Sequence, residues 1–172
     1  MIRALDGITP KIHPTAFVSE AAYLVGDVAL GPNSSVWPGV VIRADSGKIK
    51  IGAATNIQDN SDLHADADAE IGDNVTIGHG VVCPALNIGD GSLVGNGSTL
   101  NVGVDLGDNC LVAAGSTVTE NSVFEAHSLV RGTPGKAIGK IRTRHAELMS
   151  RAAASYVNRI ARYTASGLAH AD

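Results

Sequence analysis

Two histidines, His64 and His79, carry the side chains of this sequence that are best suited to chemistry. The segment Thr55-Asn-Ile-Gln-Asp59 precedes them and adds an amide at Gln58 and a carboxylate at Asp59. A neutral imidazole binds metal ions and also acts as an acid or base near neutral pH. The alternative is structural, with both rings hydrogen-bonded to an Asp or Gln at an interface. The choice depends on the elements that position the two rings.

An aliphatic residue recurs every six positions along most of the chain. A small or β-branched residue stands four positions after most of these anchors, and Gly often follows the anchor directly. A period of six excludes an α-helix, whose period is about 3.6. The anchors are Ile12, Val18, Leu24, Leu30, Val36, Ile42, then Ile51, Ile57, Leu63, then Ile71, Ile77, Cys83, and finally Ile88, Val94, Leu100, Leu106, Val112, Val118, Phe124 and Val130.

This pattern predicts an all-β fold. Each unit of six supplies a short strand with one inward aliphatic side chain and then a tight corner, so three units close a triangular rung. Rungs stack at about 4.8 Å through parallel backbone hydrogen bonds. The aromatic content of 3% and the 20 glycines suit so narrow a core. We therefore expect a parallel β-helix of hexapeptide repeats, a triangular prism, over residues 1–138.

The C-terminal part of the chain has a helical period instead. Met149, Ala153, Tyr156, Ile160 and Tyr163 recur at steps of three and four residues and form one apolar face. We expect an α-helix within residues 139–166 that packs on the prism, and a short tail at 167–172.

Charge and composition restrict the possible partners. The net charge is −4, and seven of the 13 basic residues follow position 135. The interpretation is an acidic body with a basic helix laid on it, which argues against nucleic-acid binding. No signal peptide or long apolar run is present, so we expect a cytoplasmic protein without membrane contact. The two cysteines, Cys83 and Cys110, fall at inward positions and are expected in the core.

The six-residue register places the two histidines on different corners of the prism. Asp59, His79 and Asn96 each follow a second-corner anchor by two residues and form one column. A second column holds four residues that directly follow third-corner anchors, namely Arg43, His64, Pro84 and Asn101. Within one chain the two rings should not meet. They can meet only where two prisms lie side by side, which predicts a site between subunits.

These motifs resemble the γ-class carbonic anhydrases and their relatives, over the whole prism from about Ile12 to Lys136 and into the helix. The resemblance rests on Arg43-Ala-Asp45, Ile51-Gly, Thr55-Asn-Ile-Gln-Asp59, His64 and Val75-Thr-Ile-Gly-His79. It implies a left-handed β-helix and a homotrimer. It also implies a zinc ion at each subunit interface, held by two histidines of one chain and one of its neighbour. Such an ion activates water to attack CO2 and form bicarbonate.

The resemblance assigns most site positions but leaves one unfilled. His64 matches the first zinc ligand, and His79 matches the ligand donated by the neighbouring subunit. The third ligand should stand five residues after His79, where this chain has Pro84, which offers no donor atom. Asn96 stands where the family has methionine, and its side chain could hydrogen-bond His79 or supply a weak ligand oxygen.

Other family positions are retained. Gln58 and Asp59 match residues that orient the zinc-bound water, and Asn56 lines the site beside them. Arg43 and Asp45 match an ion pair at the subunit interface. A short acidic turn at 65–70, between the two histidines, contains Asp66 and Asp68. These residues could carry protons, or, more simply, the turn is a solvated loop.

Three functions are consistent with these residues. The first is a metalloenzyme acting on CO2, bicarbonate or a related substrate, with zinc on His64 and His79 plus a substitute ligand. The second is a non-catalytic trimeric scaffold or subunit that has lost the metal. The third is an acyl-CoA-dependent acyltransferase, since hexapeptide acyltransferases share the repeat.

Overall fold

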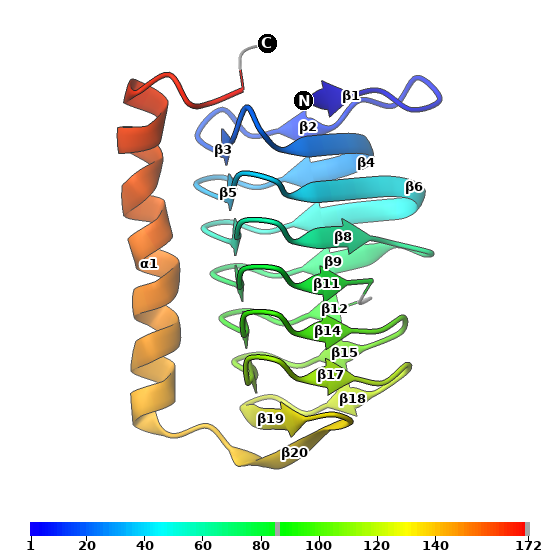
Figure 1. Ribbon diagram of the computed structural model, residues 1–172, viewed down its shortest axis with the longest axis vertical. Helices are drawn as coiled ribbons and strands as arrows, with labels where there is room; N and C mark the ends of the chain where they lie inside the picture. Colours follow the sequence, from blue (N-terminus) through cyan, green and yellow to red (C-terminus); the bar gives the residue numbers. More distant parts are fainter. Residues whose placement is uncertain (85–86, 171–172) are drawn as a thin grey trace.

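The computed structural model describes residues 1–84 and 87–170, and it is a parallel β-helix with one α-helix laid along it (Figure 1). One face of the prism is a sheet of eight strands, most of them two residues long. Its strands are β3 (Phe17–Val18), β5 (Ser35–Val36), β7 (Asn56–Ile57), β10 (Thr76–Ile77), β13 (Leu93–Val94), β16 (Leu111–Val112), β19 (Ser128–Gly132) and β20 (Gly135–Lys140).

The other two faces belong to one sheet of twelve strands, because β4 and β6 are long enough to pass through the corner between them. The pairing of β6 with both β8 and β9 joins the two faces. The strands are β1 (Ile2–Arg3), β2 (Lys11–Ile12), β4 (Tyr23–Leu30), β6 (Val41–Ile51), β8 (Asp62–His64), β9 (Ala69–Ile71), β11 (Val82–Cys83), β12 (Asn87–Ile88), β14 (Thr99–Leu100), β15 (Asp105–Leu106), β17 (Thr117–Val118) and β18 (Val123–Phe124).

The predicted stacking of the anchors is confirmed. Ile57 pairs with Ile77, which pairs in turn with Val94, and Leu63 pairs with Cys83. All these side chains belong to one continuous buried core inside the prism. Full burial of an aliphatic side chain contributes about 1.5–3 kcal/mol. The repeated column of such side chains is therefore what holds the rungs in register.

The corners depend on residues that tolerate a left-handed backbone. Five asparagines have φ values between 54° and 60°. This left-handed backbone conformation costs most L-residues energy, but asparagine adopts it at lower cost because its short polar side chain can hydrogen-bond locally. Ala54 adopts the same conformation, with φ of 55°, and its side chain brings no such compensation. The five are Asn33, Asn60, Asn74, Asn109 and Asn121.

The helix α1 (Thr143–Ala165) runs back along the stack toward its N-terminal end (Figure 1). It packs against β5, β7 and β10 of the eight-stranded sheet. Met149, Ala153 and Tyr156 are its buried residues, as the apolar periodicity predicts. Before it, β20 folds back antiparallel on β19, so the last rung is covered by its own chain.

Beyond the helix, the chain returns to the first rungs. Ala169 forms a β-bridge with Ser19, and the His170 N–H donates to the Val18 carbonyl. Ala171 and Asp172, which complete the expected tail, lie outside the described residues. Within the described part of the chain, no helix combines the length and apolarity that a membrane crossing requires.

Candidate functional site

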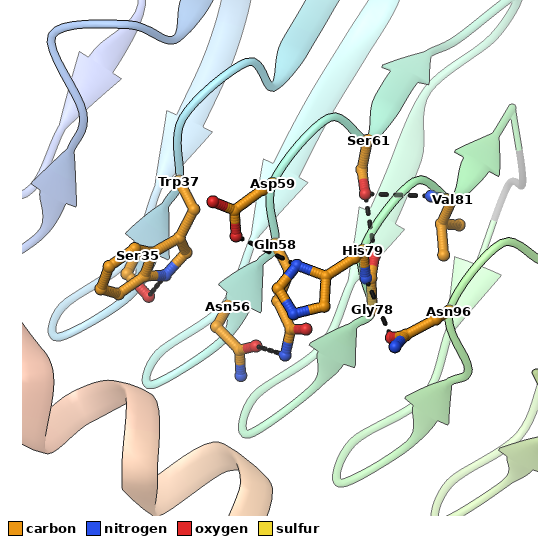
Figure 2. Close-up of polar contacts among 10 residues, drawn as sticks. All are labelled: Ser35, Trp37, Asn56, Gln58, Asp59, Ser61, Gly78, His79, Val81 and Asn96. Atoms are coloured by element: carbon orange, nitrogen blue, oxygen red, sulfur yellow. Dashed lines mark hydrogen bonds and ion pairs between the residues drawn. The ribbon is translucent and has the colours of Figure 1, made fainter.

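Asp59 and His79 are adjacent on one corner of the prism. Each stands two residues past the end of its strand, β7 or β10, and those strands are paired in register. The Asp59 Oδ2 lies 3.0 Å from the His79 Nδ1, and Figure 2 shows the two side chains turned toward each other. The His79 side chain is 48% exposed, so this pair is open to a neighbouring molecule.

Asn96, one rung further, fixes the backbone of this corner. Its Oδ1 accepts the His79 backbone N–H at 3.1 Å (Figure 2). The two residues are therefore hydrogen-bonded, but the donor is the His79 main chain and the ring takes no part. Gly78 makes the approach possible, because a Cβ there would lie 2.5 Å from the Asn96 Oδ1.

Asn56 and Gln58 are buried on the sheet that α1 covers, with exposed fractions of 1% and 6%. The Gln58 Nε2 donates to the Asn56 Oδ1 at 2.9 Å, and the Asn56 Nδ2 donates to the Thr76 Oγ1 at 2.9 Å. These amides satisfy one another within the protomer. Their geometry supports the corner that carries Asp59.

His64 lies in the other sheet, at the end of β8. It pairs with Arg43 of β6, and the Leu63–Cys83 pairing places Pro84 one rung away. The structure therefore brings Arg43, His64 and Pro84 into the column predicted for them. It keeps His64 at the end of β8 and His79 in the turn after β10, on different corners as the register requires.

The His64 ring has an unusual deficit. Its Nδ1 is buried, has no hydrogen-bond partner among the described residues and lies 3.8 Å from the Asp62 Oδ2, too far for a hydrogen bond. Beside it, Arg43 and Asp45 form an exposed ion pair with an N–O distance of 2.6 Å. A buried nitrogen without a partner costs free energy, so the His64 Nδ1 is an unsatisfied polar atom of the protomer.

The residues present do not fit the three-histidine zinc site that the resemblance implies. Pro84 is buried at the third ligand position and offers no electron pair to a metal. Cys83 next to it belongs to the core, as predicted. Within residues 1–84 and 87–170, no three His, Cys, Asp or Glu side chains cluster closely enough to hold a metal ion. The positions matched to zinc ligands therefore hold two imidazoles, those of His64 and His79.

Helix α1 adds groups that the sequence did not assign to the site. Burial raises the pKa of Tyr156, the Arg159 guanidinium opposes that shift, and the charge of Asp59 adds to it. Arg159 lies over the Tyr156 ring, with its Cζ 4.5 Å from the ring centroid. Tyr156 thus lies within electrostatic reach of the corner. The only sequence signal was its place on the apolar helix face.

Comparisons with known proteins agree with this architecture. Residues 69–101 and 85–120 match the hexapeptide repeat of succinyl-transferase. Carnitine operon protein CaiE of Escherichia coli K12 is 37% identical over 140 residues, covering 80% of this chain and 71% of CaiE. The mitochondrial gamma carbonic anhydrase 2 of Arabidopsis thaliana is 35% identical over 158 residues, covering 87% of this chain. The chain spans 57% of the length of that relative.

A solved structure matches the whole fold. It is a hexapeptide transferase family protein from Anaplasma phagocytophilum, with a TM-score of 0.90 and 31% identity, covering 94% of this chain and 97% of that one. The chain therefore belongs to the hexapeptide-repeat family that contains the γ carbonic anhydrases and CaiE.

Proposed function

We propose that the protein works as a homotrimer of the γ-carbonic-anhydrase type in which the intersubunit hydratase site has become a non-catalytic subunit contact. One observation carries this proposal: buried Pro84 occupies the place of the third zinc ligand. Two imidazoles from two chains hold zinc weakly, and the acidity of zinc-bound water depends on a firmly held ion. The protein then has the scaffold of the family without its hydration of CO2.

The trimer is supported by the unsatisfied groups around His64. Its buried Nδ1 has no hydrogen-bond partner among the described residues, and Val82 on the same face is 41% exposed. The His64 side chain is nevertheless 27% exposed, so a neighbouring prism that presents its Asp59–His79 corner here would cover the valine and place polar groups beside the exposed part of the imidazole. His64 and Pro84 from one chain and His79 from the next then line a shared space between subunits, termed the crevice.

The first experiment measures CO2 hydration by stopped flow, with zinc added, for three proteins. The natural protein and the Pro84→Ala variant are expected to match the uncatalysed rate. The Pro84→His variant is expected to hydrate CO2 above that rate, because Asp59, Gln58 and both other histidines are already in place. Hydration by the natural protein that a chelator removes would contradict the proposal.

A second experiment tests whether the crevice lies between chains. Two variants of the chain both carry Pro84→His. One of them also carries His64→Ala and the other also carries His79→Ala, and the two are produced separately or together. Neither homotrimer has a complete ligand set, whereas a mixed trimer completes some crevices from the two chains. Zinc binding that appears only on co-production supports the arrangement. A monomer in analytical ultracentrifugation, or no gain on co-production when the Pro84→His protein itself binds zinc, would overturn it.

Acyl transfer is the second candidate, since the Anaplasma structure belongs to a hexapeptide transferase family. An acyltransferase requires a CoA groove and a base beside it. Asp59 and His79 would supply the base. Calorimetric titration of the intact protein with acetyl-CoA separates the two functions: our proposal predicts no binding heat, and saturable binding would favour acyl transfer instead.

A further inference from the structure

A cleft of about 760 Å³ lies between the first rungs of the prism and the last turns of α1. None of the residues assigned to the crevice lines it. In Figure 1, the last turns of α1 lie at the end of the stack that carries β3. Its volume falls within the range of about 300–1,000 Å³ that is typical of small-molecule sites.

The seam, meaning the contact between α1 and the prism, changes from large to small side chains along its length. The cleft exists where the side chains are small. Further along the seam, large rings fill the space: Trp37 stands 5.1 Å from Tyr156 and 4.8 Å from Tyr163 between ring centroids. At the N-terminal end, small residues line the same seam. They are Ala16, Ala161, Ala165 and Ala169.

The walls are mainly aliphatic. Ile2, Ile12 and Val18 come from the prism, and Val157 and Ile160 come from α1. This surface would gain free energy by contact with an apolar chain, at roughly 25 cal/mol for each Å² removed from water.

One side of the cleft carries an oriented hydrogen-bond donor. The Thr15 backbone N–H donates to the His13 Nδ1 at 3.2 Å, and the Thr15 Oγ1 lies 3.0 Å from the same nitrogen. That hydroxyl also accepts the Asn33 N–H at 3.0 Å, and the Thr15 backbone N–H fixes the role of the imidazole nitrogen. The His13 Nδ1 is therefore the acceptor, and the neutral ring carries its proton on Nε2.

The charge around the cleft also restricts the ligand. The titratable groups among its described lining residues are His13 and His170, with no carboxylate and no lysine or arginine. An anionic group bound here meets the His13 imidazole and no carboxylate side chain among the described lining residues.

We propose that this cleft binds a short unbranched carboxylate, with its apolar chain against the isoleucines and its carboxylate accepting the His13 Nε2–H. The site is independent of the crevice and of the proposed function. Octanoate is the probe, and calorimetry of the intact protein is expected to give saturable binding with a dissociation constant of about 0.1–1 mM.

Two variants on the same helix test the place of binding. Ala161→Leu puts a larger side chain into the cleft and is expected to weaken octanoate binding at least about tenfold. Ala154→Leu is the matched control, because Ala154 lies on the exposed side of α1 and does not line the cleft. Equal loss in both variants, or unchanged binding in the first, would overturn the assignment.

Two further comparisons test the recognition of the carboxylate. His13→Phe keeps a ring but removes the donor, and it is expected to weaken octanoate binding about tenfold or more. Octanol has the same chain without the charge and is expected to bind the natural protein about tenfold more weakly than octanoate. Octanol binding as tightly as octanoate, or no octanoate binding to the natural protein, contradicts the proposal.

Discussion

The carboxylate of Asp59 holds the ring of His79, with 3.0 Å between the Asp59 Oδ2 and the His79 Nδ1. The two residues are 20 positions apart in sequence but one rung apart on the same corner. A carboxylate on one ring nitrogen fixes the direction of the other and selects the tautomer of a neutral ring. In the neutral His79 ring, the Nε2 is then the acceptor that the corner presents to its surroundings.

The Asp59→Asn variant is expected to remove the selection of a single His79 tautomer. An amide either accepts from or donates to the Nδ1, so the neutral His79 ring should become a mixture of both tautomers. Two-bond ¹H–¹⁵N spectra of the imidazole rings measure this ratio. Asp62→Asn is the control, because its carboxylate is 3.8 Å from the His64 ring and makes no hydrogen bond to it. An unchanged His79 spectrum in Asp59→Asn would mean that the carboxylate does not select the tautomer.

The aromatic seam predicts a large stability effect at Trp37. This side chain is 3% exposed and packs against Phe17, Tyr156 and Tyr163 between the prism and α1. Trp37→Ala should lower the free energy of unfolding by about 3–5 kcal/mol, since it leaves a cavity in this seam. Urea unfolding followed by circular dichroism measures the loss.

Val123→Ala is the matched control for the seam, because Val123 is 73% exposed. Its unfolding free energy should stay within about 0.5 kcal/mol of the natural protein. A similar small effect for Trp37→Ala would show that the helix is held by other contacts.

The corner at Ala54 predicts a stabilising substitution. Ala54 has φ of 55° and occupies the corner conformation that Asn33 and Asn74 adopt in adjacent rungs. Ala54→Asn should raise the free energy of unfolding by about 0.5–1 kcal/mol, because asparagine tolerates this conformation at lower cost. Thermal unfolding checks the gain. Ala53→Asn, which lacks a positive φ, should give none; a lower melting temperature for Ala54→Asn would count against the corner argument.

Two buried acids predict loss of stability in alkaline solution. Burial raises the pKa of Cys110 above its ordinary 9.0, and burial likewise raises that of Tyr156 above 10.0. In both cases the unfolded chain loses its proton first, so the stabilisation is complete below the unfolded pKa values and declines as pH rises above about 9. Urea midpoints measured from neutral pH to about pH 10.5 should fall. The fall of the urea midpoint should be smaller in a Cys110→Ala, Tyr156→Phe double variant. An equally steep fall in that variant would refute the assignment of the alkaline loss to these two groups.

The sequence allowed the rungs and the site columns to be predicted because the period of six maps directly onto stacked positions. Ile57 above Ile77, and His64 beside Arg43, follow from counting residues along the chain. The apolar helix face was also readable, because its period differs from that of the repeat.

Other features depend on contacts that no local pattern encodes. The structure packs Trp37 under α1, a place that the six-residue pattern around it does not indicate. The burial of Asn56 and Gln58 was missed for the same reason, since the covering helix lies about 90 residues further along the chain. The long strand β6, which passes through a corner, appears in the sequence only as the break between Ile42 and Ile51, whereas β4 passes through its corner with no break in the repeat.

Zinc content per subunit tests the central claim most directly. The natural protein and Pro84→His are purified in parallel, equilibrated with zinc, freed of loosely bound ion by gel filtration and measured by elemental analysis. The account predicts almost no zinc in the natural protein and close to one ion per subunit in Pro84→His. One tightly held zinc per subunit in the natural protein would contradict it.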